Sequence, residues 1–397
     1  MQNQPRYVKL IMVSAENRNK YYEMTWDGVS PSFSVKYGRL ESTATTGSYP
    51  ISQWNTKYNE KVKKGYKDVT EYVAVTVTTQ APTTQDLDKI TDQIVDKFMS
   101  LMKKYTDGLV SKTYSVKAVA VTQKQVDDAQ KLLNELSTMT KKSQKEINDK
   151  LIELYMIIPR YMGHVSHHLL PSINLDKTLV QEQDNLDAMA SQVAMIATTT
   201  KPKKKKVEKN TILDVLGIKM KEAKPGKDVK YLIDQISSTG RRVESFFEVD
   251  KPSENKRFED WLSKQNDKST RILIHGTRCT SVIPILEQGL KIRPAGNFQF
   301  SGKVYGDGNY FSEVVNKSLG YVGHDNDKIL LVYEVHTGNP FVYDGWYRGN
   351  SFTLNYKNLK ERGFDSTYVK AGHGLLNTEI IAYKEEQCRI KYIIWLK

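Results

Sequence analysis

Hydrophobic residues in the middle of the chain recur at intervals of three and four, which is the spacing of one face of an α-helix. The stripes are carried by Leu87, Ile90, Ile94, Phe98, Leu101 and Tyr105; by Val126, Ala129, Leu133 and Leu136; by Ile147, Leu151, Leu154 and Ile158; and by Leu175, Leu179, Leu186, Met189, Val193 and Ile196. Pro159 ends the third stripe, because a proline cannot continue a helix. The pattern predicts an all-α bundle over residues 84–197, with the stripes forming its core.

The N-terminal region instead shows partial alternation of apolar and polar residues and many aromatic side chains, which is typical of β-strands. Strands are predicted over residues 8–13, 20–26 and 33–37, and a helix over residues 51–64. Asp27 and Gly28 indicate a turn between two of the strands, and Gly65 ends the helix. We therefore expect a small mixed α/β domain over residues 1–78.

The C-terminal part is rich in short apolar runs joined by glycine-containing loops. The runs cover residues 271–274, 329–335, 379–383 and 390–395. They favour an antiparallel α+β domain over residues 210–397, and a lysine-rich linker at 198–209 separates it from the bundle. The expected fold class is therefore an α+β multidomain protein.

Charge adds one inference about partners. Among 397 residues, 59 Lys and Arg outnumber 46 Asp and Glu, for a net charge of +13. A surplus of this size favours polyanions such as nucleic acid through counterion release. A lysine-rich solvated surface gives the same number, so charge alone leaves both interpretations open.

Cysteine content and hydropathy exclude other classes. The two cysteines, Cys279 and Cys388, are too few for a disulfide framework or a four-cysteine zinc site, and no metal is expected. The cluster His164, His167 and His168 has no Cys, Asp or Glu nearby at ligand spacing. No apolar run reaches the roughly 18 residues of a membrane span, so no membrane partner is expected.

Candidate chemistry lies in short clusters of the C-terminal part. His275 and Gly276 follow an apolar strand, Tyr310 and Tyr321 lie in and after a glycine-rich loop, and Glu379 opens another apolar strand. Two tyrosines can stack on a planar ring, and a carboxylate can stabilise a glycosyl cation. Taken alone, the three clusters are more typical of a buried histidine, a core tyrosine and an edge charge, respectively.

The order and spacing of these clusters closely resemble the catalytic domain of the poly(ADP-ribose) polymerase family. The matching stretches are residues 274–278, 285–292, 306–311, 317–318, 375–379 and 390–397. The resemblance implies an NAD+ ADP-ribosyltransferase, a glycosyltransferase of the pentosyl-transferring kind that consumes NAD as its substrate. It implies cleavage of the nicotinamide–ribose bond and transfer of ADP-ribose to proteins, including the enzyme itself.

The resemblance also implies how NAD is held. His275 would hydrogen-bond the adenine-side ribose. The Gly276 backbone and the Ser318 hydroxyl would grip the carboxamide of nicotinamide, and Tyr310 and Tyr321 would stack on its ring.

The catalytic triad implied by the resemblance is His275, Tyr310 and Glu379. Glu379 would hold the 2′-hydroxyl of the nicotinamide ribose, stabilise the positive charge that develops there, and orient the acceptor hydroxyl. Lys317, which precedes Ser318, also matches the family and would support NAD binding.

Some positions depart from the family pattern. Lys303 replaces a common stacking tyrosine, Val304 a larger apolar residue, and Asn377 a tyrosine on the acceptor side. The NAD-cleaving residues are untouched, so these differences bear on acceptor geometry and polymer length.

Upstream, residues 84–197 resemble the family's helical regulatory, autoinhibitory domain, and residues 1–78 resemble its WGR module. The overall order is similar to the short, DNA-dependent members that lack zinc fingers.

The WGR signature is Tyr37-Gly38-Arg39 here, and Lys61 and Lys64 fit a later part of the module. The resemblance implies DNA, chiefly strand-break ends, as a partner contacted by Tyr37, Arg39, Lys61 and Lys64. Arg39 and Tyr37 would also contact the neighbouring domain. An ordinary solvated strand face explains the same residues without DNA.

The basic run at residues 201–206 is typical of a nuclear import signal and equally of a solvated interdomain loop. We expect a nuclear protein if the source is eukaryotic, and otherwise a cytoplasmic one.

The sequence therefore predicts a poly(ADP-ribose) polymerase activated by DNA breaks and acting in the DNA damage response. The alternatives are a mono-ADP-ribosyltransferase and a DNA-end-binding scaffold with an inert catalytic fold.

Overall fold

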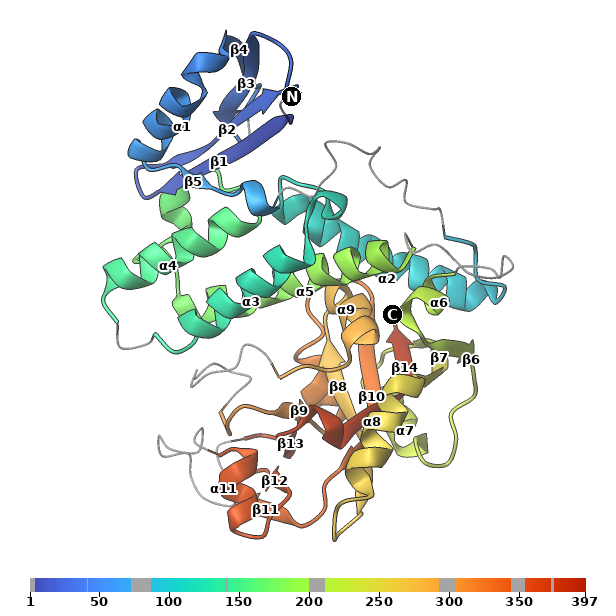
Figure 1. Cartoon of the computed structure of the whole chain (residues 1–397). Coiled ribbons are helices and arrows are strands. Elements are labelled where there is room, and N and C mark those ends of the chain that lie inside the picture. Colours follow the sequence, from blue (N-terminus) through green and yellow to red (C-terminus); the bar gives the residue numbers. More distant parts are fainter. Residues whose placement is uncertain are drawn as a thin grey trace. The chain divides into compact units, whose positions relative to one another are not determined.

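The computed structural model describes residues 4–40, 42–72, 87–139, 142–199, 211–292, 304–343, 354–372 and 375–397 (Figure 1). The chain divides into two compact units, one of Met1–Thr84 with Leu109–Ile196 and the other of Gln85–Gly108 with Ala197–Lys397. Each unit is described by itself. The basic run at 201–206 and Lys303 lie outside the described residues.

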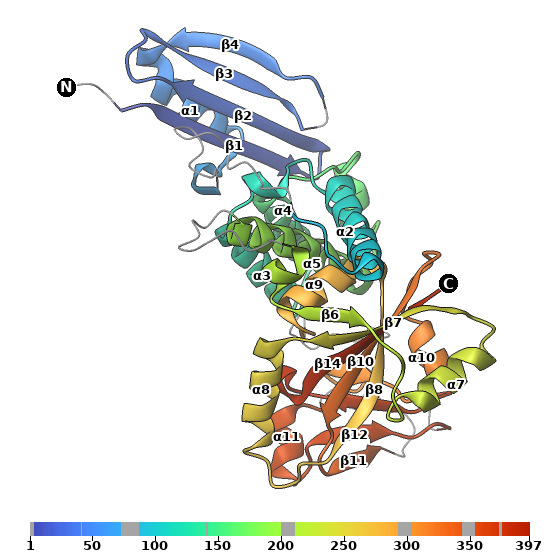
Figure 2. The same ribbon diagram turned by 90° about the vertical axis from the view of Figure 1, so that its right-hand side faces the viewer.

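The N-terminal domain is a five-stranded antiparallel sheet with one helix on one face, which both views show (Figure 1, Figure 2). Its strands are β1 (Arg6–Ser14), β2 (Arg18–Trp26), β3 (Ser32–Arg39), β4 (Thr45–Pro50) and β5 (Lys67–Asp68), in the order β4-β3-β2-β1-β5. Helix α1 (Trp54–Lys63) packs Trp54 edge-on against Phe33, with ring centroids 5.0 Å apart. The predicted strands and helix are confirmed, and the short 3₁₀ turns η1 (Ile51–Gln53) and η2 (Thr70–Tyr72) flank α1 and β5.

The predicted turn after β2 is built by Asp27. Its Oδ1 accepts hydrogen bonds from the backbone N–H of Val29 at 2.9 Å and of Ser30 at 2.8 Å. Gly28 has a φ of 89°, a left-handed conformation that glycine adopts without steric cost. The hydrogen bonds from Ser30 and Val29 lower the pKa of Asp27 to about 2.

The middle region forms helices α2 (Gln93–Thr113), α3 (Gln123–Leu136), α4 (Gln144–Ile157) and α5 (Leu175–Thr199), with 3₁₀ turns η3 (Ala118–Ala120) and η4 (Val165–His168). Capping boxes at Thr122 and Ser143 start α3 and α4. Most residues of the predicted stripes on α3, α4 and α5 are buried, and α4 stops before Pro159 as expected. Helix α2 begins only at Gln93, so the first predicted stripe was too long at its start.

The helical segment after residue 109 is bonded to the N-terminal sheet in the same unit. Asn19 of β2 donates from its side chain to the Arg160 carbonyl at 3.2 Å. Asn17 accepts from the Val165 N–H at 3.1 Å, and the Arg39 guanidinium donates to the Gly163 carbonyl. These polar contacts join the end of the β1–β3 hairpins to the loop before η4.

The C-terminal part contains two sheets, as Figure 2 shows. The five-stranded sheet consists of β6 (Lys219–Glu222), β7 (Val243–Asp250), β14 (Cys388–Leu396), β10 (Lys328–His336) and β8 (Thr270–Thr277), in that order. The four-stranded sheet consists of β11 (Pro340–Tyr343), β12 (Ser366–Val369), β13 (Glu379–Ala382) and β9 (Asn309–Phe311), in that order. Among the described residues, the strand pairings of both sheets are antiparallel except that of β11 with β12, so the predicted α+β class is confirmed.

Helices cover these sheets. They are α6 (Ile212–Leu216), α7 (Lys230–Ser238), α8 (Pro252–Leu262), α9 (Cys279–Gln288), α10 (Val315–Leu319) and α11 (Tyr356–Glu361), with the 3₁₀ turn η6 (Glu385–Gln387). The central strands β10 and β14 are buried along nearly their whole length, which explains their continuous apolar runs.

The first turns of α2 pack on this sheet and belong to the same unit. Phe98 lies against Phe247 and Trp395, with ring centroids 4.8 Å and 5.6 Å apart. Tyr105 donates its hydroxyl to the Asp327 carboxylate at 3.0 Å. Residues 85–108 therefore fold with the C-terminal part, whereas the expected boundary placed all of 84–197 in one bundle.

Candidate active site

The predicted site residues gather where the two C-terminal sheets meet. Strand β8, at the edge of one sheet, is bridged to the end of β9 in the other. Ile274 N–H donates to the Ser312 carbonyl at 2.9 Å, and Ser312 N–H donates back to the Ile274 carbonyl at 3.0 Å. This pair of backbone hydrogen bonds fixes His275 and Gly276 beside Tyr310.

His275 is half-buried in β8, and its Nδ1 lies 3.0 Å from the backbone carbonyl of Tyr310. A carbonyl oxygen only accepts, so Nδ1 carries the proton and Nε2 keeps a free lone pair when the ring is neutral. Burial lowers the pKa of His275, more than the hydrogen bond to Tyr310 raises it. The neutral ring therefore offers a hydrogen-bond acceptor at Nε2.

Gly276 has no room for a side chain. A Cβ atom at this position would lie 1.9 Å from the backbone oxygen of Ser318. Strand β8 thus touches α10 backbone to backbone, which only glycine permits. Ser318 itself is buried, and its hydroxyl makes a long 3.5 Å contact with the Ile274 carbonyl. A hydrogen bond of that length is weak, so the hydroxyl can turn to a ligand at little cost.

Tyr310 is held by the loop that precedes it. Its hydroxyl accepts from the Tyr305 N–H and donates to the Gly306 carbonyl, both at 2.8 Å. Tyr305 is in turn tied to Tyr383, whose hydroxyl donates to the Tyr305 carbonyl at 2.7 Å. The ring of Tyr310 is therefore preorganised before any ligand binds.

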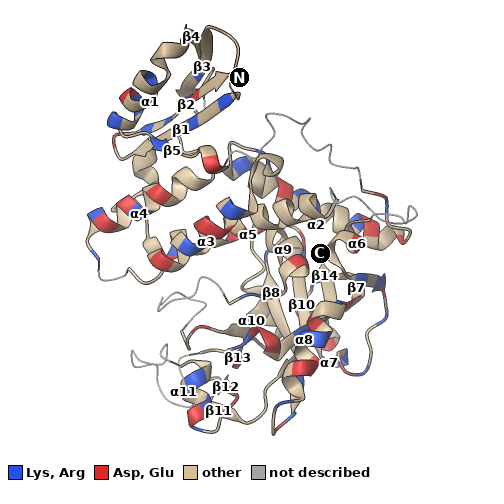
Figure 3. Ribbon diagram, in the orientation of Figure 1, with Lys and Arg blue, Asp and Glu red and all other residues tan. Residues whose placement is uncertain are grey.

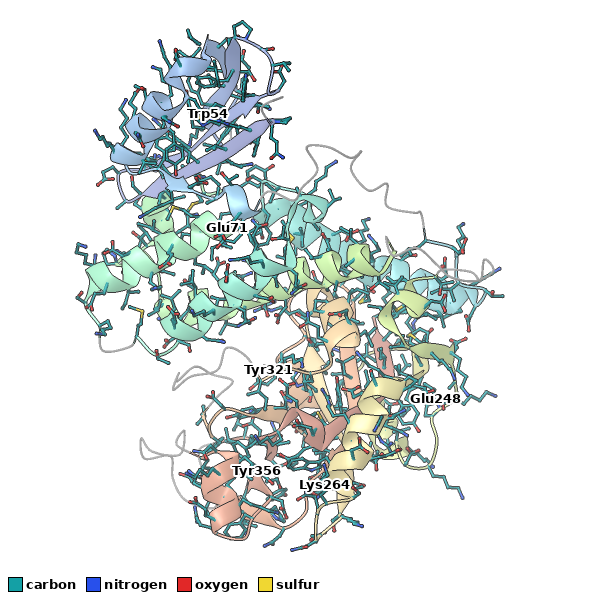
Figure 4. The ribbon with its side chains drawn as sticks, viewed as in Figure 1. Trp54, Glu71, Glu248, Lys264, Tyr321 and Tyr356 are labelled. Atoms are coloured by element: carbon teal, nitrogen blue, oxygen red, sulfur yellow. The ribbon has the colours of Figure 1, made fainter. Side chains whose placement is uncertain are left out.

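Tyr321 follows α10 and is labelled in Figure 4. Its side chain remains 42% exposed, so the ring is available to a ligand. The Lys317 ammonium lies 5.8 Å from the ring centroid, within cation–π range.

Glu379 begins β13 and is buried, at 6% exposure. The Lys317 ammonium lies 2.9 Å from its Oε1. Burial by itself lowers the pKa of Lys317, but the hydrogen bond and charge of Glu379 outweigh it and raise that pKa. The pair therefore holds a carboxylate in a partly dehydrated site, where a charge acts more strongly than in water.

Strand register places Glu379 and Tyr310 on one face of the second sheet. Ile381 is paired with Tyr310, and Ile380 with Phe311. Because side chains alternate along a strand, Glu379 and Ile381 share the face of Tyr310. The structure thus brings together the whole predicted triad and the supporting Lys317 and Ser318.

Sequence reasoning missed two polar side chains behind the site. The Ser312 hydroxyl donates to the Thr378 carbonyl at 3.2 Å and accepts from the Val314 N–H at 3.0 Å. Gln235 of α7 accepts from Val315 N–H and donates to the Glu313 carbonyl, both at 2.9 Å. The bond between Ser312 and Val314 is local, but the other three contacts join segments that are distant in sequence, so no local pattern indicates them.

Two of the positions that depart from the family pattern, 304 and 377, lie in the described residues. Val304 packs in the core cluster around Tyr305, and Asn377 is half-buried. Leu376, next to Asn377, is 96% exposed. Val304 thus supports the core beside Tyr305, whereas Asn377 lies next to an exposed residue.

In the N-terminal domain, Lys61 is surrounded by tyrosine rings. Its ammonium lies 4.3 Å from the ring centroid of Tyr22, 5.6 Å from Tyr37 and 5.8 Å from Tyr66. Burial lowers the pKa of Lys61. Figure 3 shows further Lys and Arg on α1 and the adjacent strands. Tyr37 and Lys61 are thus brought together as one basic, aromatic surface.

Arg39 and Lys64 are placed differently. The Arg39 guanidinium donates to the Asn17 carbonyl at 2.8 Å, to the Asn17 side chain at 3.1 Å, and to the Gly163 carbonyl. Two of these hydrogen bonds therefore stay within the N-terminal domain, and one reaches the neighbouring helical part. Lys64 is exposed and pairs with Glu60 at 2.7 Å.

Three other features that bear on function are the cysteine Cys279, possible metal-binding groups and possible membrane-spanning helices. Burial raises the pKa of the Cys279 thiol to about 12, so it is not a reactive thiolate at neutral pH. No group of His, Cys, Asp and Glu suited to a metal occurs among the described residues. Within the same ranges, no helix is long and apolar enough to cross a membrane.

Comparison with known proteins shows which protein family this chain resembles. A family model for the poly(ADP-ribose) polymerase catalytic domain matches residues 227–346, which include His275, Tyr310, Ser318 and Tyr321. "Putative poly [ADP-ribose] polymerase-like 100L" of Invertebrate iridescent virus 6 is 55% identical over 168 residues, which are 42% of this chain and 92% of that protein.

Two further relatives extend the match. "Uncharacterized protein 101L" of the same virus is 43% identical over 188 residues, 47% of this chain and 77% of that protein. "Poly [ADP-ribose] polymerase 1" of Gallus gallus is 24% identical over 310 residues, 70% of this chain and 30% of that protein. The chain belongs to the poly(ADP-ribose) polymerase family. It is an NAD+ ADP-ribosyltransferase, and NAD is its substrate.

Proposed function

We propose that the site around His275, Tyr310 and Glu379 cleaves NAD at the nicotinamide–ribose bond and transfers ADP-ribose to proteins, including the enzyme itself. The buried Glu379 carboxylate, with the Lys317 ammonium 2.9 Å away, is the observation that carries this proposal. A fixed negative charge is what the reaction requires, because positive charge develops on the ribose as the bond breaks.

The bond between ribose C1′ and the nicotinamide nitrogen breaks with both electrons going to nicotinamide, which leaves as a neutral molecule. The ribose takes up the positive charge, and the acceptor nucleophile forms the new bond to C1′ and releases its proton. Glu379 stabilises the cationic ribose and accepts a hydrogen bond from the ribose 2′-hydroxyl. Lys317 keeps the carboxylate in place through the ion pair at 2.9 Å.

Recognition of NAD is assigned to the surrounding groups. The Nε2 lone pair of neutral His275 accepts from a hydroxyl of the adenine-side ribose. The Gly276 backbone and the Ser318 hydroxyl hold the carboxamide, and Tyr310 and Tyr321 stack on the nicotinamide ring. Rings held by hydrogen bonds or packed beside a cation lose little freedom on binding, which favours affinity.

The test is a nicotinamide-release assay with NAD and the full-length chain. Glu379→Gln keeps the side-chain shape and removes the charge, and we expect at least a tenfold fall in turnover, since a single preorganised electrostatic group is worth about 2.7–4 kcal/mol. Glu361→Gln is the matched control, because Glu361 lies on the exposed end of α11. Unchanged turnover in Glu379→Gln would contradict the assigned role.

The product is proposed to be polymer. The complete His-Tyr-Glu combination supports elongation, whereas Asn377 in place of a tyrosine favours single-unit transfer as the second candidate. Electrophoresis of the self-modified protein separates the two, because polymer gives a smear and single units give one small shift. A variant Asn377→Tyr that lengthens the smear would assign the limit to this position.

We further propose that DNA breaks stimulate the enzyme through the N-terminal domain. The basic, aromatic surface of Lys61 and Tyr37 supports contact with phosphate and unstacked bases, and the Arg39 contact with the Gly163 loop supports communication with the helical part. Nicotinamide release with intact, nicked and blunt-ended DNA tests this. Equal rates with all of them and with no DNA would overturn DNA activation while leaving NAD cleavage standing.

For location, we propose that the basic run at 201–206 directs the chain to the nucleus of a eukaryotic cell. A fluorescent fusion in which the four lysines at 203–206 are replaced by alanine tests it, and unchanged distribution would remove this proposal.

A further inference from the structure

Ser312 lies at the point where four elements of the site meet. It follows β9 two residues after Tyr310, and it is only 2% exposed. Its backbone forms both hydrogen bonds of the bridge to Ile274 in β8. Its side chain is therefore held in one place before it makes any contact of its own.

The hydroxyl of Ser312 uses both of its hydrogen-bonding capacities. It donates to the carbonyl of Thr378, the residue directly before Glu379, at 3.2 Å. It accepts from the N–H of Val314, the N-cap of α10, at 3.0 Å. One oxygen atom thus connects the start of β13 with the start of the helix that carries Lys317.

This connection spans the base of the Lys317–Glu379 pair. The ammonium and the carboxylate meet at 2.9 Å, but Lys317 and Glu379 are 62 positions apart in the chain. The Ser312 hydroxyl links the segments of these two residues at the Thr378 carbonyl, next to Glu379, and at the Val314 N–H, at the start of α10. Gln235 gives α10 a second hold at Glu313 and Val315, but it makes no contact with the strand of Glu379.

We propose that Ser312 is a positioning residue that sets the place of the Glu379 carboxylate relative to Lys317 and to the ribose. This inference rests on the proposed catalytic role of Glu379. Loss of the hydroxyl lets β13 and α10 shift independently, and a displacement of about 1 Å at a catalytic group can cost up to roughly a hundredfold in rate. Ser318 also stands on α10, but its backbone stays in direct contact with Gly276 of β8. We therefore expect NAD binding to change less than the placement of Glu379.

The decisive variant is Ser312→Ala, measured for kcat and KM of nicotinamide release. We expect kcat to fall about tenfold, with KM for NAD changed less than twofold. Ser312→Cys retains a weak donor at the same position and is expected to recover part of the loss.

Ser366→Ala is the matched control. Ser366 is completely buried and donates its hydroxyl to the Thr337 carbonyl at 2.7 Å, at the far end of β12 from the Val369–Glu379 pair. Removal of either hydroxyl leaves a buried carbonyl without its partner and costs about 1–3 kcal/mol of stability. A purely structural role of Ser312 would therefore give equal losses of unfolding temperature and equal, small changes in kcat.

A double-mutant cycle with Glu379→Gln completes the test. If Ser312 acts through the carboxylate, Ser312→Ala lowers kcat in the native background but adds no further loss when Glu379 is already Gln. Additive losses, or a kcat within twofold of the native value for Ser312→Ala, overturn the inference.

The outcomes distinguish this inference from the proposed function. Full activity of Glu379→Gln contradicts the proposed function, whereas a strong effect of Glu379→Gln with none of Ser312→Ala contradicts only the role of Ser312. Should Ser312→Ala prove too unstable to assay, Ser312→Cys takes its place in the same cycle under the same criteria.

Discussion

Lys317 in the candidate active site and Lys61 in the N-terminal domain are both partly buried, but their surroundings are opposite in kind. Lys317 contacts the Glu379 carboxylate at 2.9 Å, and this contact raises its pKa despite burial. Lys61 is surrounded by the rings of Tyr22, Tyr37 and Tyr66, and burial lowers its pKa. In the described part of the chain, Lys61 forms no ion pair.

The difference teaches what each cation can do. Lys317 is committed to an internal anion, so its charge fixes a carboxylate and is not available to a phosphate. Lys61 lies among ring faces, whose negative potential is weak, and the nearby Glu60 carboxylate, which pairs with Lys57 and Lys64, adds a further attraction. An external anion therefore meets a charge that is not held in an ion pair among the described residues. The same residue type is thus paired with a carboxylate in one region and lies among aromatic rings in the other.

The largest effect is expected at Gly276, whose backbone contacts α10, the helix that carries Lys317. Gly276→Ala would push a methyl group into the Ser318 backbone oxygen, 1.9 Å from the ideal Cβ position. Strand β8 and α10 must then separate, and we expect kcat/KM for NAD to fall about a hundredfold or more. Gly108→Ala is the control, since no atom lies within 4 Å of that added Cβ. A mild effect of Gly276→Ala would show that the close backbone contact between Gly276 and Ser318 is not needed.

The next largest effect concerns the pair itself. Lys317→Met keeps the length of the side chain but leaves the buried Glu379 carboxylate without its partner, which lowers stability because breaking a buried pair is unfavourable. We expect kcat to fall about 10- to 100-fold, less than for a group that acts on the reacting atoms directly, because Lys317 acts through Glu379. Lys317→Arg should recover part of the loss. Steady-state nicotinamide release measures both, and equal rates for Met and Arg would break the comparison.

A smaller effect is expected on the Lys61 side. Lys61→Gln should weaken binding to a blunt-ended duplex and reduce the salt dependence of the binding constant by about one in log–log slope, as for one lost phosphate contact. Lys64→Gln is the matched variant, because Glu60 already partly neutralises Lys64 at 2.7 Å. Fluorescence anisotropy at several salt concentrations should show the larger change for Lys61. The reverse order would contradict the role assigned to the tyrosine surroundings.

The smallest effect is a pH dependence from His275. Burial lowers its pKa below 6.5, so the ring is neutral at pH 7 and protonates only when the pH falls below that value. Protonation turns Nε2 from an acceptor into a donor, and KM for NAD should therefore rise as the pH falls below about 6.5. Folding stability declines over the same range, since the unfolded chain binds the proton more readily. A KM that rises above pH 7 instead would contradict the neutral tautomer.

Much of the local structure could be predicted from the sequence. The turn at Asp27 and Gly28, the strand at 329–335 and the end of α4 before Pro159 all depend on neighbours within a few residues. Such signals are local because backbone propensity and side-chain periodicity act over one or two turns. The assignment of residues 85–108 to the C-terminal unit was less predictable, because Phe98 and Tyr105 contact residues far along the chain.

The identity of the candidate site was likewise in the sequence. His275, Tyr310 and Glu379 stand in an order and spacing that resemble one enzyme family, and the comparisons show that the chain belongs to it. Their individual roles remain predictions, since spacing along a chain does not state which side chains touch.

Only the tertiary structure decided the partners. Lys317 finds Glu379, and Ser312 finds Thr378, because strand register and the bridge between two sheets bring together segments more than sixty positions apart. Arg39 turns to the Gly163 loop, whereas Lys61 remains among tyrosine rings. The sequence determined which charged groups the protein has. Folding determined which of them form ion pairs with each other and which remain available to a ligand.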